Sequence, residues 1–502
     1  MVIGFQVNKN AIFIFLNKTP HHYRQSMKHF FLILLLIYLA VRAQAQADVP
    51  KTYSKPVIMH YMPWFDTPEF NGQWGWHWTM NNRNPDIIVD PMLGKREIAS
   101  HFYPLIGPYA SKDSDVIEYH LLLMKYAGVD GVIIDWYGVQ GRNGDINSLL
   151  TNSNALIDMT DEVGLQFSVM LEDRFADSIG DGQANFAYLR DNYFTKPNYT
   201  RHGIGNAPLI GVFGPITFEL QSDWDSITPY AGEDITLLPL WYESNDMGIH
   251  ADGEYSWIYE VDSLNDYARR LERFYQNRAP GRDVVMGIAY PGFKDFYAEG
   301  NAGNSFFTIP HQNTLDTTFQ LTQQYDTDID LLQLATWNDF GEGTMFEPTL
   351  EFGYQFLVEL QQFLGVGYGE KEFMQIHRLY LLRKKYTNDM AAQTQLDQVF
   401  DHFTNLRVDD AINLMDVVDG TSHIESAAFA NIQIFPNPTS SILVIKGSLP
   451  FDTNIELFTV LGEKIRIDIH DQTVDLSGVK QGMYWLVMQA NGKRRSVLVS
   501  KW

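Results

Sequence analysis

The sequence predicts an α/β protein, a (β/α)8 (TIM) barrel with a helical extension, followed by a small all-β sandwich. Two observations predict the barrel. Short, almost wholly apolar runs alternate with helix-length segments, which is typical of parallel strands that are covered on both faces. Polar and aromatic residues also gather where these runs end, and the carboxyl ends of barrel strands carry the active site. A change to short strands of alternating hydrophobicity over residues 431–502 predicts the sandwich.

The N-terminal region predicts a secretory signal peptide. Met27 and the basic Lys28 precede an apolar run from Phe30 to Val41, and the A-x-A pattern of a cleavage site follows at residues 43–47. A membrane anchor is the alternative, but this run is too short to span a bilayer comfortably. We therefore expect residues 1–47 to comprise an over-extended start and a signal peptide, with Met27 as the true start. The mature protein should then have no transmembrane span.

Eight strands of the barrel are predicted in order along the chain. They are "PVIMHYMPW" from Pro56, "VDGVIIDWYG" from Val129, "LQFSVMLEDR" from Leu165, "APLIGVFGP" from Ala207, "ITLLPLWYE" from Ile235, "YSWIYEV" from Tyr255, "DVVMGIAYPGF" from Asp283 and "DIDLLQLATWNDF" from Asp328. An open doubly wound sheet is the alternative, but it usually has a glycine-rich turn after its first strand, and "HYMPWF" has none.

The helices are predicted from apolar residues at helical spacing. "SDVIEYHLLLMKYAG", between the first two strands, has Asp113 or Ser114 as its N-cap and Gly128 as its stop. Helical patterns continue after the last strand to about Val418, so the barrel domain with its helical extension is predicted over residues 48–418. Residues 419–430 are small and polar and predict a linker.

The C-terminal segment, residues 431–502, contains several specific motifs. "IFPNPTSSILVI", "ELFTVLGEKI", "VDLSGVKQGMYWLVM" and the basic end "GKRRSVLVSKW" resemble the C-terminal sorting domain of type IX secretion cargo. The resemblance implies that the type IX secretion machinery is a partner. It also implies that the protein is secreted or displayed on the outer-membrane surface of a Bacteroidetes-type bacterium. A small carbohydrate-binding sandwich is the alternative.

The charge and the lack of cysteine exclude several functions. The chain has 61 acidic and 37 basic residues and a net charge of −24. Nucleic acid and anionic membranes need a cationic face, so we expect neither as a partner, whereas a neutral polysaccharide or glycan is compatible. Without cysteine there are no disulfides, thiolate metal sites or cysteine nucleophiles.

The stretch "ATWNDFGEGTMFEP" (residues 335–348) places Asp339, Glu342 and Glu347 among aromatic residues, just after a buried strand. Glycoside hydrolysis needs two carboxyl groups that flank the scissile bond, one protonated and one ionised. Aromatic surroundings exclude water and raise a carboxyl pKa, which favours the protonated partner. The alternative is a polar loop in which Glu342 lies near the N-terminus of the following helix.

Three blocks, "HYMPWF", "GVDGVIIDWYG" and "WNDFGEGTMFEP", together resemble glycoside hydrolase families 99 and 71. These families contain endo-acting α-mannosidases and mannanases (family 99) and α-1,3-glucanases (family 71), and the resemblance implies a barrel without a metal cofactor. The family 99 block reads Asn-Glu-Trp-x-Glu-Gly-Thr. Asn338 matches it, Asp339 takes the first Glu position and Glu342 the second.

By this resemblance Glu342 is the general acid/base and Asp339 the second catalytic carboxylate. The first carboxylate of the family is thought to act as a base on the 2-hydroxyl of the sugar, which gives a 1,2-anhydro intermediate and overall retention. Asp339 is one methylene shorter than glutamate, so it could instead orient a water molecule, which gives inversion.

Residues at the strand ends are predicted to bind substrate, because carboxylates hydrogen-bond sugar hydroxyls and aromatic rings offer platforms for sugar rings. For each aromatic residue packing in the core is the alternative, and for Glu172 and Asp173 it is a salt bridge with Arg174. His60 and His77 are too isolated to indicate a metal site, so no cofactor is expected. The predicted set is His60, Tyr61, Trp64, Asp135, Trp136, Tyr137, Glu172, Asp173, Trp241, Tyr242, Tyr290, Asn338 and Glu347.

These observations favour a secreted or cell-surface glycoside hydrolase that acts within chains of α-linked mannan or glucan and uses two carboxylates. The alternative is a non-catalytic surface glycan-binding protein on the same barrel scaffold, which the replacement of the first glutamate by Asp339 keeps open.

Overall fold

The computed structural model describes residues 46–501 except for 260–265, 421–431, 451, 460–463, 471 and 491–492. The predicted start at Met27, nearly all of the predicted signal peptide and most of the predicted linker lie outside the described residues. Within the described part of the chain, no helix has both the length and the apolar character that are needed to cross a membrane.

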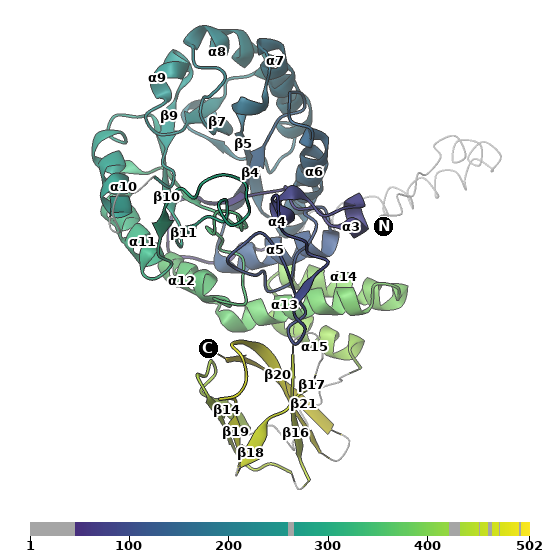
Figure 1. Cartoon of the computed structure of the whole chain (residues 1–502). Coiled ribbons are helices and arrows are strands. Elements are labelled where there is room, and N and C mark those ends of the chain that lie inside the picture. Colours follow the sequence, from purple (N-terminus) through teal and green to yellow (C-terminus); the bar gives the residue numbers. More distant parts are fainter. Residues whose placement is uncertain are drawn as a thin grey trace, which may run out of the picture. The chain divides into compact units, whose positions relative to one another are not determined.

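Eight parallel strands form the barrel that the sequence predicts (Figure 1). Seven neighbouring pairs are ladders, and β13 pairs with β1 at the closing seam. The eighth seam, between β8 and β9, is made by a parallel bridge between Leu240 and Tyr255. The strands are β1 (Val57–Tyr61), β4 (Gly131–Trp136), β5 (Gln166–Leu171), β7 (Ala207–Val212), β8 (Thr236–Pro239), β9 (Gly253–Tyr255), β10 (Val284–Ala289) and β13 (Leu331–Leu334).

The interior of the barrel is filled by alternate residues of these strands, among them Ile58, Ile133 and Met170. Side chains of a strand alternate between its two faces, so the residue two positions further on points to the same side. His60, Asp135 and Glu172 follow these three core residues by two positions. They therefore lie on the interior side of β1, β4 and β5 at the carboxyl ends, where the barrel opens.

Helices connect the strands and cover the outside of the barrel (Figure 1). In the first of them, α5, the Asp113 carboxylate accepts the Asp115 N–H, and the helix ends at Gly128 with φ +89°. Both the cap and the stop are as predicted. The helices are α5 (Ser114–Ala127), α6 (Ile146–Val163), α7 (Ile179–Tyr188), α8 (Gln221–Ile227), α9 (Ser244–Met247), α10 (Asp266–Asn277), α11 (Thr314–Gln324) and α12 (Gln355–Leu364).

The predicted helical extension consists of α13 (Glu370–Lys385), α14 (Met390–Thr404) and α15 (Val408–Val418). It packs on the barrel through α5. Nearly every residue of α5 is buried. Glu118 of α5 and Arg383 of α13 form a buried ion pair at 2.8 Å.

Long connections at the carboxyl ends of the strands contain short elements. The connection from β1 to α5 includes α3 (Pro68–Asn71), α4 (Trp76–Thr79), β2 (Ile88–Asp90) and β3 (Lys95–Arg96). The connection from β10 to α11 contains β11 (Phe293–Lys294) and β12 (Thr308–Ile309), which pair in antiparallel fashion. A short strand, β6 (Arg201–His202), pairs with the start of β7.

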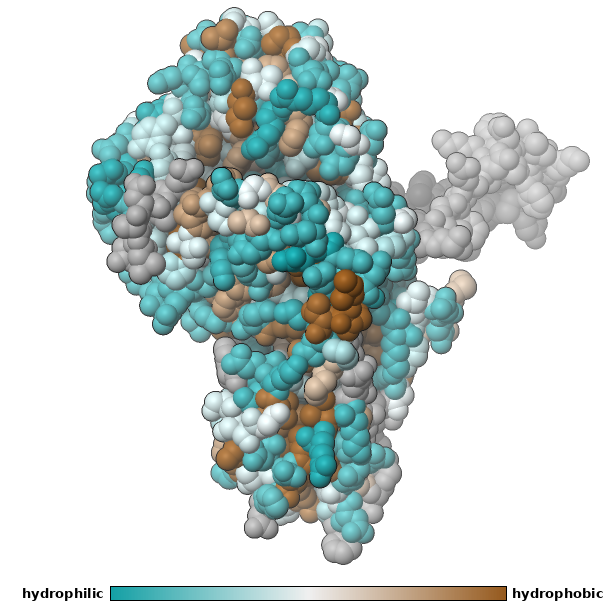
Figure 2. All heavy atoms as spheres, in the orientation of Figure 1, coloured by the Kyte–Doolittle hydropathy of each residue, from teal (hydrophilic) through white to brown (hydrophobic). Residues whose placement is uncertain are grey.

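The C-terminal domain has two four-stranded antiparallel sheets, as the alternating pattern predicts. Residues of both sheets, such as Leu443 and Leu486, share one apolar core. One sheet contains β14 (Gln433–Phe435), β15 (Ile442–Lys446), β18 (Asp468–His470) and β19 (Thr473–Asp475). The other contains β16 (Asn454–Thr459), β17 (Lys464–Ile465), β20 (Gly482–Ala490) and β21 (Lys493–Lys501). The face of the molecule in Figure 2 is mainly hydrophilic, which agrees with the strongly acidic composition.

Candidate active site

The turn after β13 carries the two predicted catalytic carboxyl groups. Its base is closed by Thr336, whose N–H donates to the Thr344 carbonyl at 2.9 Å and whose carbonyl accepts the Phe346 N–H at 2.8 Å. Inside the turn, the Asp339 N–H donates to Thr336 Oγ1 at 2.8 Å, and Asp339 Oδ1 accepts the Glu342 N–H at 2.9 Å. The Asp339 carboxylate therefore closes the turn that presents Glu342.

A segment of the β10–α11 connection runs beside this turn. The N–H groups of Lys294 and Phe296 donate to the carbonyls of Glu342 and Gly341, each at 2.8 Å. The Tyr297 hydroxyl donates to Glu342 Oε1 at 3.0 Å. The sequence analysis did not identify Tyr297, because it lies in an irregular connection 45 residues before Glu342.

The two carboxyl groups have different pKa values. Burial, together with the charge of Asp339, raises the pKa of Glu342 to about 8, and the hydrogen bond from Tyr297 lowers it in part. Burial raises the pKa of Asp339 to about 6, and backbone N–H groups oppose this rise. Near pH 7, Glu342 is therefore mainly protonated and Asp339 mainly ionised, which is the division of roles that a pair of catalytic carboxyl groups needs.

A second acidic pair lies at the ends of β4 and β5. Burial raises the pKa of Asp135 well above its usual range, and the charge of Glu172 adds to this. Burial raises the pKa of Glu172 to about 7 even though Arg174 lowers it, with Arg174 Nε at 2.7 Å from Glu172 Oε2. The charge of Asp339 also raises the pKa of Asp135, and Arg174 lowers that of Glu342. The two acidic pairs therefore act on each other across the same end of the barrel.

Aromatic side chains surround this end of the barrel. The Trp64 ring stacks on His77 at 4.0 Å between centroids, and Tyr137 packs against Phe175 at 4.0 Å. His60 is buried and hydrogen-bonded through Nδ1 to Gln333 Oε1 at 3.1 Å, and burial lowers its pKa to about 4. A neutral His60 and apolar rings suit a neutral, hydroxyl-rich ligand.

Trp257 belongs to the same group of aromatic side chains around the barrel end, but it was not predicted as a site residue. Its ring centroid lies 4.9 Å from that of His60 and 5.3 Å from that of Phe213. The predicted sixth strand begins at Tyr255, whereas β9 ends there. Trp257 therefore lies beyond the strand end, where site residues are expected.

Four predicted aromatic site residues pack away from the mouth. Tyr61 is buried and hydrogen-bonded to His120 Nδ1 at 3.0 Å, on the face of β1 that meets α5. Trp136 is buried beside Tyr188 of α7. Trp241 and Tyr290 belong to a separate apolar cluster with α10 residues. The prediction for these residues is corrected: they pack in the core.

Tyr242 lies outside that core. It is 47 % exposed, has a positive φ of 70°, and the guanidinium of Arg278, the residue just after α10, covers its ring at 4.8 Å. It therefore contacts the residue that follows α10, on the outside of the barrel, and the structure does not bring it to the two acidic pairs.

Asn338 and Glu347 bind groups of the protein itself. The Asn338 side chain bonds the N–H and the carbonyl of Met62 and the Tyr109 hydroxyl, at 2.8, 3.0 and 3.0 Å. Glu347 is 1 % exposed, accepts from the Tyr109 hydroxyl at 2.6 Å and lies 3.2 Å from His120 Nε2. Their predicted role is corrected from substrate binding to anchoring the turn after β13 to the segment after β1.

Asp173 has a comparable structural role. It is completely buried, and its carboxylate accepts the N–H groups of Ile216, Thr217 and Phe218 at 2.8–3.0 Å. The predicted contact with sugar hydroxyls is therefore replaced by a clamp on the loop after β7. The alternative salt bridge to Arg174 is made by Glu172 instead.

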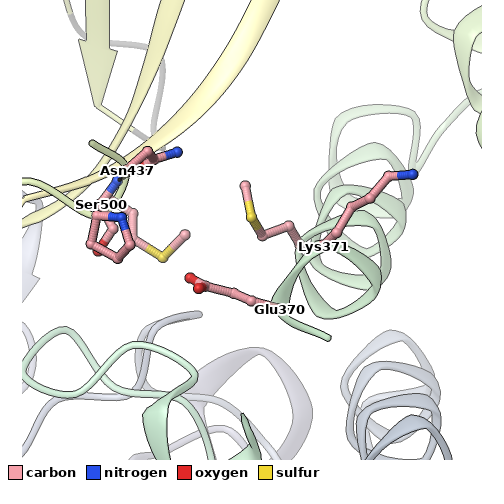
Figure 3. Close-up of a pocket in the computed structure, with 7 residues that line it drawn as sticks. Glu370, Lys371, Asn437 and Ser500 are labelled. Carbon is pink, nitrogen blue, oxygen red and sulfur yellow. Dashed lines mark hydrogen bonds between the residues drawn. The ribbon is translucent and has the colours of Figure 1, made fainter. Parts of the chain in front are cut away.

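Figure 3 shows a pocket that contains none of these side chains. It is lined by Glu370, Lys371, Met374, Asn437, Pro438, Met483 and Ser500. The carboxyl groups that could carry out chemistry lie at the barrel mouth instead, in the turn after β13 and at the ends of β4 and β5.

Comparison with protein families gives two matches. Residues 52–236 match the model of glycosyl hydrolase family 99, and residues 433–500 match that of the secretion system C-terminal sorting domain. The chain thus combines a family 99-like barrel with a secretion sorting domain. The first match ends before the turn that holds Asp339 and Glu342. The second confirms the predicted C-terminal domain and indicates export by type IX secretion, with release or attachment at the cell surface.

Known relatives and solved structures agree with the first match. The chain is 26 % identical over 327 residues to the glycoprotein endo-α-1,2-mannosidase of Rattus norvegicus, covering 58 % of this chain and 67 % of that protein. It is 25 % identical over 162 residues to the Xenopus laevis enzyme of that name, of which the match spans only 35 %. The structure of a GH99 endo-α-mannosidase from Bacteroides thetaiotaomicron, with 19 % identity, superposes with a TM-score of 0.50 over 65 % of this chain and 99 % of that one, which shows that the two share a fold. The two family matches and the two relatives support a secreted glycoside hydrolase.

Proposed function

We propose that the protein is an endo-acting glycoside hydrolase that cleaves α-linked mannan, with Glu342 as general acid/base and Asp339 as second carboxylate. The observation that carries the proposal is the turn after β13, which holds the buried Asp339 and the half-buried Glu342, two carboxyl groups of different pKa, at the mouth of the barrel. In this proposal residues 48–418 form the catalytic domain and residues 431–502 the sorting domain, joined by a linker at 419–430 and preceded by a removed segment, residues 1–47.

The first step follows from the protonation states. Glu342, protonated near pH 7, donates its proton to the glycosidic oxygen as the bond to the anomeric carbon breaks. Asp339 Oδ1 is engaged by the Glu342 N–H, which leaves Oδ2 to accept a proton. The proton comes either from the 2-hydroxyl of the sugar, which then attacks the anomeric carbon, or from a water molecule that attacks it directly. In the first route a water molecule then opens the 1,2-anhydro sugar at the anomeric carbon. The ionised Glu342 takes a proton from that water and Asp339 returns its proton to the 2-oxygen, so two inversions give overall retention. The second route has one displacement and inverts the configuration.

The residues that we propose to bind the glycan are those that face the mouth: His60, Trp64, Asp135, Tyr137, Glu172 and Trp257. Asp135 and Glu172 offer oxygens to sugar hydroxyls, and the rings provide apolar faces. The choice of α-mannan rests on the similarity to proteins named endo-α-1,2-mannosidases, and α-glucan is the alternative substrate.

The experiment compares the purified protein with its Glu342→Gln and Glu359→Gln variants on a panel of α-mannans and α-glucans, and analyses the released oligosaccharides. Glu359 lies on α12 and accepts a local hydrogen bond from Gln355 at 2.8 Å, so its variant is a matched control. Cleavage by the wild type and the control, but not by Glu342→Gln, supports the proposal. NMR of the first-formed anomer separates retention from inversion.

Two outcomes would contradict the proposal. If Glu342→Gln cleaves as fast as the control, Glu342 is not the general acid and another residue donates the proton. If the wild type retains a glycan on an affinity gel but releases no oligosaccharide from it, the protein is a glycan-binding protein on a barrel scaffold.

A further inference from the structure

We propose that Tyr297 is a positioning residue that fixes the carboxyl group of Glu342 for proton transfer. The proposal deepens the function given above and rests on the role of Glu342 in it. The Tyr297 hydroxyl donates to Glu342 Oε1 at 3.0 Å. With Oε1 occupied in this way, Oε2 is the oxygen left to hold the proton that the glycosidic oxygen receives.

The Tyr297 side chain is itself held in place. The buried Asp295 carboxylate accepts the N–H of Tyr297 at 3.2 Å and that of Phe306 at 2.9 Å. The Tyr297 ring packs edge-on against Phe306 at 5.4 Å between centroids. The carbonyl of Asp295 accepts a hydrogen bond from His101 Nε2 at 3.1 Å. The hydroxyl therefore sits on a fixed part of the connection and not on a free loop.

The same segment also fixes the backbone of the catalytic turn. Lys294 and Phe296 donate to the carbonyls of Glu342 and Gly341, each at 2.8 Å, so donors of this segment lie on both sides of Asp295. On the far side of the turn His311 Nε2 donates to the Gly343 carbonyl at 2.6 Å. Because one segment binds both the main chain and the side chain of Glu342, the distance between the hydroxyl and the carboxyl group is set by local geometry.

The charged and titratable groups that act on Glu342 come from several elements. Asp339 of the same turn and Asp295 of the β10–α11 connection raise its pKa, whereas Arg174 at the end of β5 lowers it. Tyr297 lowers it through the hydrogen bond. Removal of the Tyr297 hydroxyl alone leaves all these charges in place, so its effect on Glu342 can be separated from theirs.

The test uses Tyr297→Phe, which removes one oxygen and keeps the ring. A hydrogen bond to an ionised carboxylate favours the charged form, so its loss should raise the pKa of Glu342 by about one unit, a tenfold change in the proton-binding constant. This is read by a 13C titration of the glutamate carboxyl groups, with Glu342→Gln to assign the signal. In parallel, the alkaline limb of the pH profile of kcat/KM should move up by the same amount, and kcat should fall about tenfold or more.

Tyr325→Phe is the matched control. The Tyr325 hydroxyl also donates to a glutamate, Glu272 Oε1 of α10 at 3.1 Å, on the outside of the barrel. This variant should leave the Glu342 titration and the pH profile unchanged. Melting temperatures of both variants close to that of the wild type show that the comparison is made on folded protein.

An unchanged pKa of Glu342 in Tyr297→Phe would overturn the inference, even if activity fell, because a merely structural loss would lower kcat without moving the titration. The 13C titration needs no substrate. A wild type that cleaves nothing therefore contradicts the proposed function, while the Glu342 titration still decides the role of Tyr297.

Discussion

Asp173 allows a direct test of structure against sequence pattern. The sequence pattern places it with the sugar-binding residues, whereas the structure has its buried carboxylate accepting three backbone N–H groups of the loop after β7. Ile216 is 46 % exposed, so water can replace the acceptor for its N–H. The N–H groups of Thr217 and Phe218 are more enclosed, and each left without a partner costs about 1–3 kcal/mol. We therefore expect Asp173→Ala to lower the free energy of unfolding by about 4 kcal/mol.

For a domain of this size about 1 kcal/mol corresponds to about 2 °C, so the melting temperature should fall by about 8 °C. Asp173→Asn keeps one acceptor oxygen and should lose about half as much. Asp177 lies in the same β5–α7 connection as Asp173, and its exposed carboxylate is 3.7 Å from Arg142 Nε, so Asp177→Ala should change the melting temperature little. Differential scanning calorimetry and urea titration measure these shifts. The reasoning fails if Asp173→Ala has the same melting temperature as the Asp177→Ala control but no longer binds glycan.

Three further predictions concern pH, the catalytic turn and export. Because Asp339 must lose its proton and Glu342 must keep one, kcat/KM should rise with pH through about 6 and fall through about 8; a profile flat from pH 5 to pH 9 would contradict this assignment. Gly343 has φ +67°, and a Cβ there would lie 2.8 Å from the Lys294 carbonyl oxygen, so Gly343→Ala should lower the melting temperature by a few degrees and kcat by about tenfold. Gly367→Ala, which meets open space, should do neither. A chain that ends at Gly420 lacks the sorting domain and should not cross the outer membrane, so it should stay in the periplasm. Cell fractionation and immunoblotting measure where the chain is found. Its appearance at the cell surface would show that export does not need that domain.

The barrel fold was predictable because the same pattern, an apolar run followed by a helical segment, repeats along the chain. Continuous apolar runs bounded by helical patterns reveal parallel strands even without any knowledge of their order. Polar and aromatic residues after the apolar runs also indicate where most of the strands end, with β9 as an exception. The boundary of β9 was misjudged because Tyr255 and Trp257 are both aromatic and flank the true end of the strand.

The candidate site was predictable only in part. Neighbours along a strand point to opposite faces, so His60 and Asp135 enter the barrel whereas Tyr61 and Trp136 meet helices. The period-two alternation could have separated them. No such signal exists for Tyr297 or for the clamp by Asp173, because each depends on an irregular connection that comes close to its partner only in the folded chain.

The seam between β8 and β9 has a consequence for the durability of the protein outside the cell. The other seven seams pair over three to six residues each. This one has the Leu240–Tyr255 bridge, and the Asp252 carboxylate supplements it by accepting the Leu237 N–H at 2.8 Å. Partial opening of the ring should therefore begin here, with amide protons of β8 and β9 exchanging sooner than those of β4 and β5. An opened seam exposes strand edges to proteases and to other chains. Resistance to proteolysis and to aggregation therefore depends more on the few contacts between β8 and β9 than on the size of the core.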